Sequence, residues 1–149
     1  MQVKNILTIL LISVNFISYS QKVSLHKQFY GSYDFTMIGN TMNTKANGDP
    51  NSCEILTEST AELNISSDRE VVAAYLYWAG IGGKKEADLN VKLNGNEVVS
   101  TRTNNLIVDT SQDAGYFSAF ADVTSIVKKE GVGTYILSDL DLRKHLPRY

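Results

Sequence analysis

The side chains that could carry chemistry are few and lie far apart in the sequence. There is one cysteine, Cys53, and there are two histidines, His26 and His145. A cysteine nucleophile needs a base that is near in space only, so a Cys53–histidine pair is one alternative. The sequence contains no HExxH, no GxSxG, no phosphate-cradling glycine loop and no paired-cysteine zinc spacing. The sequence therefore predicts a protein that is not an enzyme, with no catalytic residues.

Carboxylates are more numerous, and one pair has a spacing that could bind a cation. Asp139 and Asp141 in SDLDL share one face of an expected strand, with side chains about 7 Å apart at the strand rise. Their hard oxygen atoms are suitable calcium ligands. Solvent-facing alternation, with Leu140 and Leu142 inward, is the simpler interpretation. We therefore expect no cofactor, with calcium at Asp139 and Asp141 as the alternative.

An aromatic run offers the best candidate for binding. Residues 71–83 read VVAAYLYWAGIGG, and neither face of the run is charged, so we expect a central strand covered on both sides. The glycines of Ala79–Gly83 are expected to end it in a tight turn. Trp78 is expected as a core anchor. The functional alternative is a platform on which sugar rings stack, made by Tyr75, Tyr77 or Trp78.

The first twenty residues match the pattern of an export signal. Lys4 supplies a positive start, Ile6 to Ile12 are mostly apolar, and Ser18 to Ser20 place small residues before a cleavage site. The apolar run is too short and too polar for the roughly 20 residues of a membrane span. We therefore predict a signal peptide at residues 1–20, cleavage after Ser20, and a secreted or cell-surface domain at residues 21–149.

Charge and cysteine content limit the partners. The net charge of the full chain is −2 and no basic patch accompanies it, so nucleic acid is not an expected partner. An odd cysteine in an exported protein indicates an intermolecular disulfide, a free thiol or a missing partner. All three remain open for Cys53 on the residues alone.

The remainder of the chain reads as short strands with turns between them. Asn94-Gly95, between two strand-like runs, predicts a hairpin because both residues tolerate positive φ. The expected strands are Val23–Tyr30, Tyr33–Met42, Ser59–Ile65, the run that starts at Val71, Asp88–Leu93, Glu97–Thr103, Gly115–Ala121 and Gly133–Leu142. This pattern predicts an all-β fold, an antiparallel β-sandwich of the jelly-roll type.

One segment changes period. Val123, Ile126 and Val127 lie at i, i+3 and i+4, which predicts a short helix near residues 123–129. Asp122 or Thr124 could cap its first amides. Lys128 and Lys129 suit the negative end, and Gly131 is expected to stop the helix in the left-handed conformation.

Four stretches together resemble a known family. They read YLYWAG (75–80), VKLNG (91–95), YFSAFADVTSIV (116–127) and GVGTYILSDLDL (131–142). They are similar to the N-terminal β-sandwich region of gliding-motility-associated bacterial surface proteins, which leave the cell by the type IX secretion route. The resemblance covers nearly all of residues 21–142, on motifs that are specific together and weak singly. It implies export, surface display and roles in adhesion or matrix, and it implies no catalytic residues.

The same resemblance has a consequence for the end of the chain. It implies that Cys53 pairs with a cysteine just beyond Tyr149, which is absent from this sequence, and that the chain is an N-terminal fragment of a larger protein. A truncated sandwich would leave a strand edge unpaired.

Two classes of function follow. The leading hypothesis is a non-catalytic, secreted or cell-surface β-sandwich module with an adhesion role. The alternative is a carbohydrate-binding module, with an accessory domain of a glycoside hydrolase as a lesser variant. The expected partners are an extracellular polysaccharide or another surface protein.

Overall fold

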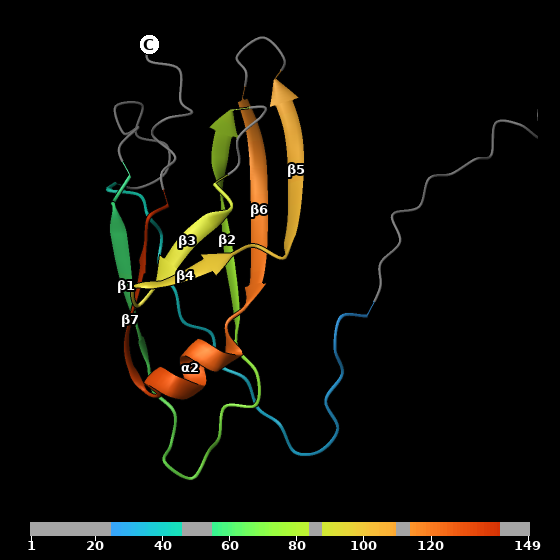
Figure 1. The fold of residues 1–149 in the computed structure, drawn as a ribbon, viewed down its shortest axis with the longest axis vertical. Coiled ribbons are helices and arrows are strands. Elements are labelled where there is room, and N and C mark those ends of the chain that lie inside the picture. The colour runs from blue at the N-terminus through green and yellow to red at the C-terminus, as the bar shows by residue number, and fades with distance from the viewer. Residues whose placement is uncertain (1–24, 46–54, 84–87, 110–113, 141–149) are drawn as a thin grey trace, which may run out of the picture. The chain divides into compact units, whose positions relative to one another are not determined.

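The computed structural model describes residues 25–45, 55–83, 88–109 and 114–140. Contacts divide the chain into two compact units, Met1–Phe35 and Thr36–Tyr149, and the regular elements of the described residues lie in the second. These elements are β1 (Glu58–Leu63), β2 (Tyr75–Gly83), β3 (Asn90–Leu93), β4 (Asn96–Val99), β5 (Arg102–Asp109), β6 (Ala114–Asp122), α2 (Thr124–Glu130) and β7 (Gly133–Ser138) (Figure 1).

The strands form two antiparallel sheets, so the prediction of an all-β sandwich is confirmed. One sheet has the order β1-β7-β3-β4 and the other the order β2-β6-β5. The first strand pairs with the seventh and the second pairs with the sixth, along their full lengths. This nested pairing folds the chain back on itself across both sheets, while β3 pairs with β4 and β7 within the first sheet.

The core lies between the sheets, with α2 at one end. It is made by the inward residues of alternating strands, as the period of two predicts. In β1, Ser59 and Leu63 are buried while Glu58, Thr60 and Glu62 face solvent. The buried core cluster is Leu63, Trp78, Val91, Leu93, Val98, Phe117, Ala119, Ala121, Val123, Val127, Tyr135 and Leu140.

The β3–β4 hairpin is confirmed. Asn94 and Gly95 have φ values of 49° and 75°, as a two-residue turn with two left-handed residues requires. The turn is also attached to β7: the Ile136 amide donates to Asn94 Oδ1 at 2.7 Å, and the Asn94 amide donates to the Ile136 carbonyl at 2.9 Å. Asn94 therefore fixes both the hairpin register and the position of the hairpin in the sheet.

The short helix is confirmed, but its first residues act differently from a simple cap. Asp122 Oδ1 accepts from the Thr124 amide at 2.9 Å, whereas Val123, at the N-cap position, has no side-chain cap bond. Thr124 Oγ1 instead accepts from the Ala74 amide at 2.9 Å. Gly131 ends the helix as expected, but its φ of 73° and ψ of −151° lie in a region open to glycine only, and not in the left-handed helical region that was expected.

Two expected strands near the N-terminus are wrong. Residues 25–42 contain no strand, although the segments 23–30 and 33–42 have strand-like composition. The composition of these segments suits a strand, but it does not provide a neighbouring strand to pair with. An isolated strand cannot satisfy the hydrogen bonds of its backbone groups. Residues 25–35, the described part of the first unit, are exposed, bend at Gly31 with φ 125°, and bring the Phe29 and Tyr33 ring centroids to 5.6 Å.

The aromatic run also differs from its prediction. The strand begins at Tyr75, not Val71, and lies at the edge of its sheet with one face open. The glycines do not end it: Gly80 pairs with Phe117, and Gly83 pairs with Ala114. Backbone hydrogen bonding needs no side chain, so the glycines of β2 stay paired with the long antiparallel strand β6.

The expected strand Glu97–Thr103 is two strands. β4 ends at Val99 and β5 begins at Arg102, because Ser100 and Thr101 carry the chain from one sheet to the other. The Ser100 amide donates to Leu89 O on the first sheet at 2.9 Å, and the Thr101 amide donates to Phe120 O on the second at 2.8 Å. The crossing places Arg102 at the start of β5, beside β6.

Candidate ligand-binding sheet face

The side of the β2-β6-β5 sheet that points away from the core is the main candidate for binding, and we call it the outer face. Its composition follows from register, because residues directly opposite each other in an antiparallel pair share a face. One row across the three strands is Tyr77, Phe120 and Arg102. The described side chains of the outer face are Tyr75, Tyr77, Ala79, Ile81, Arg102, Asn104, Tyr116, Ser118, Phe120 and Asp122.

Phe120 is the centre of this face. It is only 6% exposed although it points away from the core. Among the described residues it is covered by Tyr75 and Tyr77, whose ring centroids are 5.4 and 4.9 Å away, and by Arg102, whose guanidinium carbon lies 4.2 Å from the ring centroid. We call these four residues the Phe120 cluster. It fixes the side chains that surround Phe120 by packing and by a cation–π contact.

Tyr77 offers the largest aromatic surface of the cluster to solvent. It is 69% exposed while one side packs on Phe120. Tyr116, at 50% exposure, is a second open ring further along β6. An aromatic ring with a negative π face attracts the polarised C–H bonds of a flat apolar face, such as one side of a sugar ring. Tyr77 can therefore serve as a stacking surface.

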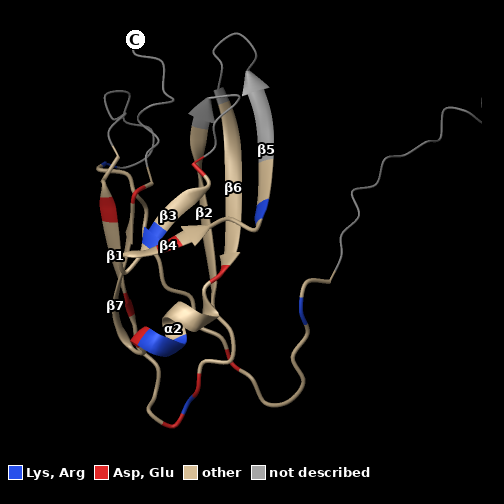
Figure 2. Cartoon of the chain, viewed as in Figure 1, with Lys and Arg blue, Asp and Glu red and all other residues tan. Residues whose placement is uncertain are grey.

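Arg102 supplies the charge on the outer face. Among the described side chains of this face the only carboxylate is Asp122, and its Oδ1 accepts from the Thr124 amide. The described residues give Arg102 no ion pair within 4.0 Å. Figure 2 shows β2 without charge and β6 charged only near its end. A guanidinium stacked on a ring keeps the N–H groups at its edge for a ligand.

The three aromatic residues that the sequence suggested as a stacking surface differ in their burial. Tyr77 is exposed and Tyr75 is half-buried beside Phe120. Trp78 is 5% exposed, packs in the core, and donates from Nε1 to the Asp88 carbonyl at 2.9 Å. The prediction of Trp78 as a core anchor is confirmed, and its proposed place in a stacking surface does not fit this burial.

The predicted calcium pair is only partly described. β7 ends at Ser138, and Asp139 has φ 61°, so the strand alternation assumed for Asp139 and Asp141 stops before the pair. Asp139 accepts from Lys92 Nζ at 2.7 Å, and this bond raises the pKa of Lys92. Asp141 lies outside the described residues. No group of three or more potential metal ligands occurs among the described side chains.

Several other predicted features lie outside the described residues. These are the signal peptide and its cleavage site at Ser20, the cysteine Cys53, and His145. Their predictions are unchanged by the structure. His26 is described and exposed.

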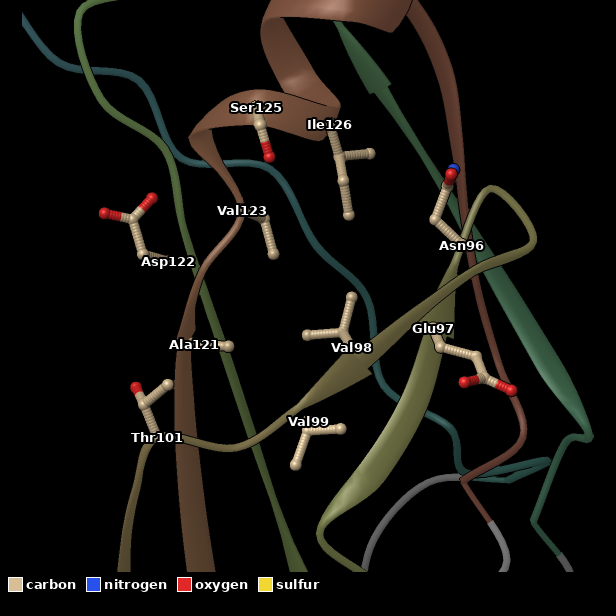
Figure 3. A pocket seen from close by; sticks show the side chains of 10 residues that line it. All are labelled: Asn96, Glu97, Val98, Val99, Thr101, Ala121, Asp122, Val123, Ser125 and Ile126. Atoms are coloured by element: carbon tan, nitrogen blue, oxygen red, sulfur yellow. The ribbon is translucent and has the colours of Figure 1, made fainter.

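A concave pocket, separate from the outer face, lies between β4 and α2, with a volume of about 420 Å³ (Figure 3). Val98, Ala121, Val123 and Ile126 give it apolar walls. The carboxylates of Glu97 and Asp122 point away from each other on its two sides in Figure 3. The complete lining is Asn96, Glu97, Val98, Val99, Thr101, Ala121, Asp122, Val123, Ser125 and Ile126. This cleft does not bring two acids together across a substrate.

Sequence reasoning missed Arg102, Tyr116 and Phe120 as site residues. In GYFSAFA, the alternation does place Tyr116, Ser118 and Phe120 on one face, so this signal was present. Arg102 had no such signal, because only the crossing at Ser100 and Thr101 brings it beside Phe120.

The geometry defines an antiparallel β-sandwich with an open aromatic face on one sheet. A scan against protein-family models finds no match for this chain, and searches of curated proteins and of solved structures find none either. No helix in the described ranges has the length and apolar character needed to cross a membrane.

Proposed function

We propose that this chain is a non-catalytic binding module of a secreted or cell-surface protein, with an adhesion role like that of the gliding-motility-associated proteins it resembles. One observation carries the proposal: the outer face presents exposed aromatic rings on a regular sheet, with Tyr77 69% exposed. A flat face of this type suits the holding of an extended ligand. The export pattern of residues 1–20 and the family resemblance support placement outside the cell.

Export is tested on the full chain carrying a C-terminal tag in a Gram-negative host. We expect a processed form that begins at Gln21 and is recovered outside the inner membrane. A variant without residues 1–20 is the control and is expected to stay in the cytoplasm. Recovery of the full chain, uncleaved, in the cytoplasm contradicts the proposal.

The Phe120 cluster favours one ligand class, a carbohydrate. A partly exposed tyrosine held in place by a buried phenylalanine is a rigid stacking surface, so little side-chain entropy is lost when a sugar binds. The neighbouring row of the outer face, Ala79, Ser118 and Asn104, has small or polar side chains, which leave space and hydrogen-bonding groups beside the ring. The carbohydrate-binding alternative is therefore our second candidate function.

A glycan array followed by titration tests this candidate. Tyr77→Leu keeps apolar cover on Phe120 and removes the aromatic face, so we expect a loss of affinity of about tenfold for the best glycan. Tyr30→Leu is the matched control, because Tyr30 is an exposed tyrosine of the first unit. Equal affinity of both variants and the parent chain contradicts the role of Tyr77. Release of new reducing ends from the bound glycan contradicts a non-catalytic module.

A further inference from the structure

We propose that the outer face selects acidic glycans, in which Arg102 pairs with a sugar carboxylate while Tyr77 stacks against a neighbouring sugar. This inference rests on the proposed carbohydrate-binding function and names the chemical class of its ligand. It follows from three observations: the availability of Arg102, its fixed orientation and its separation from Tyr77.

Arg102 differs from four other basic residues, which form ion pairs. Each of the four has a carboxylate within 4.0 Å: Lys92 with Asp139 at 2.7 Å, Lys129 with Glu130 at 3.4 Å, Lys128 with Glu70 at 3.8 Å and Arg69 with Asp68 at 3.8 Å. Arg102 has none within the described ranges, and its contact is the Phe120 ring. Its charge is therefore available to an anion from outside.

The stacking on Phe120 orients the Arg102 side chain. A guanidinium is planar and carries its N–H donors around its edge, so contact with a ring through one face leaves the edge donors free. These donors match the two oxygens of a carboxylate in a bidentate pair. Phe120 is 6% exposed and lowers the local polarity beneath Arg102.

The register sets the size of the ligand. Tyr77 lies on β2 and Arg102 on β5, each opposite Phe120 on the central strand β6. Two strand spacings, about 10 Å, separate their backbones, and their side chains converge on Phe120, with the Tyr77 ring centroid 4.9 Å and the Arg102 guanidinium carbon 4.2 Å from the Phe120 centroid. A ligand that contacts both residues crosses the strands, as a chain of two sugars can. A polysaccharide with repeated uronic acids meets both requirements.

A pair of matched probes tests the selection. Oligogalacturonate carries one carboxylate per sugar, and its fully methyl-esterified form has the same sugars without charge. We expect the purified full chain to bind the acid form at least about tenfold more tightly than the ester, as one bidentate charged contact allows. We also expect this preference to shrink as the salt concentration rises.

Three variants assign the preference to Arg102. Arg102→Gln is expected to reduce acid binding to the level of the ester. Arg102→Lys keeps the charge and the aliphatic cover over Phe120 but loses the bidentate geometry, so an intermediate affinity is expected. Arg69→Gln is the matched control on a distant loop and is expected to bind as the parent does. An unchanged urea midpoint of Arg102→Lys shows that its loss of affinity is not a loss of fold.

The outcomes separate the inference from the function on which it rests. If the parent chain binds acid and ester equally, or if Arg102→Gln keeps the preference, the acidic selection is refuted, while a loss of binding in Tyr77→Leu still supports a carbohydrate site. If neither probe binds but a neutral glycan on the array does, the selection is again refuted and the site stands. If no glycan binds at all, the carbohydrate function fails together with the inference.

Discussion

Thr124 joins the start of the helix to the chain that enters β2, and its hydroxyl gives a sharp test of the fold. Thr124 Oγ1 accepts from the Ala74 amide at 2.9 Å and donates to the Ala74 carbonyl at 3.3 Å. The two residues are 50 positions apart in sequence. We predict that Thr124→Val, which has nearly the same shape but lacks the hydroxyl, destabilises the sandwich by about 2 kcal/mol.

The predicted destabilisation comes from the backbone amide of Ala74 and not from its carbonyl. The Ala74 carbonyl also accepts from the Val123 amide at 3.0 Å, so it keeps a partner in the variant. The Ala74 amide loses the hydroxyl, and a buried donor without a partner costs about 1–3 kcal/mol. The site is partly buried, which places the expected value near the middle of this range. In a domain of this size about 2 kcal/mol corresponds to a fall in Tm of about 6–8 °C.

The measurement is equilibrium unfolding in urea, followed by circular dichroism, on the purified full chain. Thr124→Ser retains the hydroxyl and is the control, with an expected change of under about 1 kcal/mol. If Thr124→Val unfolds within about 0.5 kcal/mol of the parent, or if the serine variant is equally unstable, the attachment of Ala74 through this hydroxyl is refuted.

Three further predictions use the same unfolding assay. Gly131→Ala is expected to cost about 1–3 kcal/mol because its φ of 73° and ψ of −151° strain an alanine although the space is open, whereas Gly39→Ala, also in open space, is expected to change little. Val91→Ala is expected to cost about 2 kcal/mol at 2% exposure, and Val99→Ala at 62% exposure under about 0.5 kcal/mol. Burial, and secondarily the charge of Glu130, raises the pKa of Tyr135 above its usual value of 10.0. The unfolded chain therefore loses this proton at a lower pH than the folded chain, and the free energy of unfolding is expected to fall as the pH rises above 10. Tyr135→Phe is expected to remove that component of the pH dependence.

Local sequence patterns predicted the elements whose conformation is determined by a few neighbouring residues. Asn94-Gly95 carries the φ requirement of its turn, and the hairpin followed from it. The short helix followed from Val123 and Val127, and both are buried. The inward position of Leu63 in β1 agrees with its place between the polar residues Glu62 and Asn64 in the expected strand Ser59–Ile65. These features depend on covalent neighbours, so sequence alone contains them.

Features that depend on distant partners could not be predicted in the same way. Tyr75 and Tyr77 looked fully enclosed because the run has no charge, but no layer of the described residues covers the outer face, and Tyr77 is 69% exposed there. The strands expected before Met42 had a suitable pattern and no partner edge. Arg102 joined the Phe120 cluster only through the sheet crossing. The pattern therefore predicted which face of a strand is inward, while topology decided what covers the other face.

The nested pairing of the strands also affects how the molecule is made. Leu63 in β1 lies opposite Gly133 in β7, about 70 residues later, which a ribosome adds in roughly 4–14 s at ordinary rates. During this interval β1 has emerged but its ladder partner has not been synthesised. Such long-range pairing gives a slow folder, and the early segment is open to premature association.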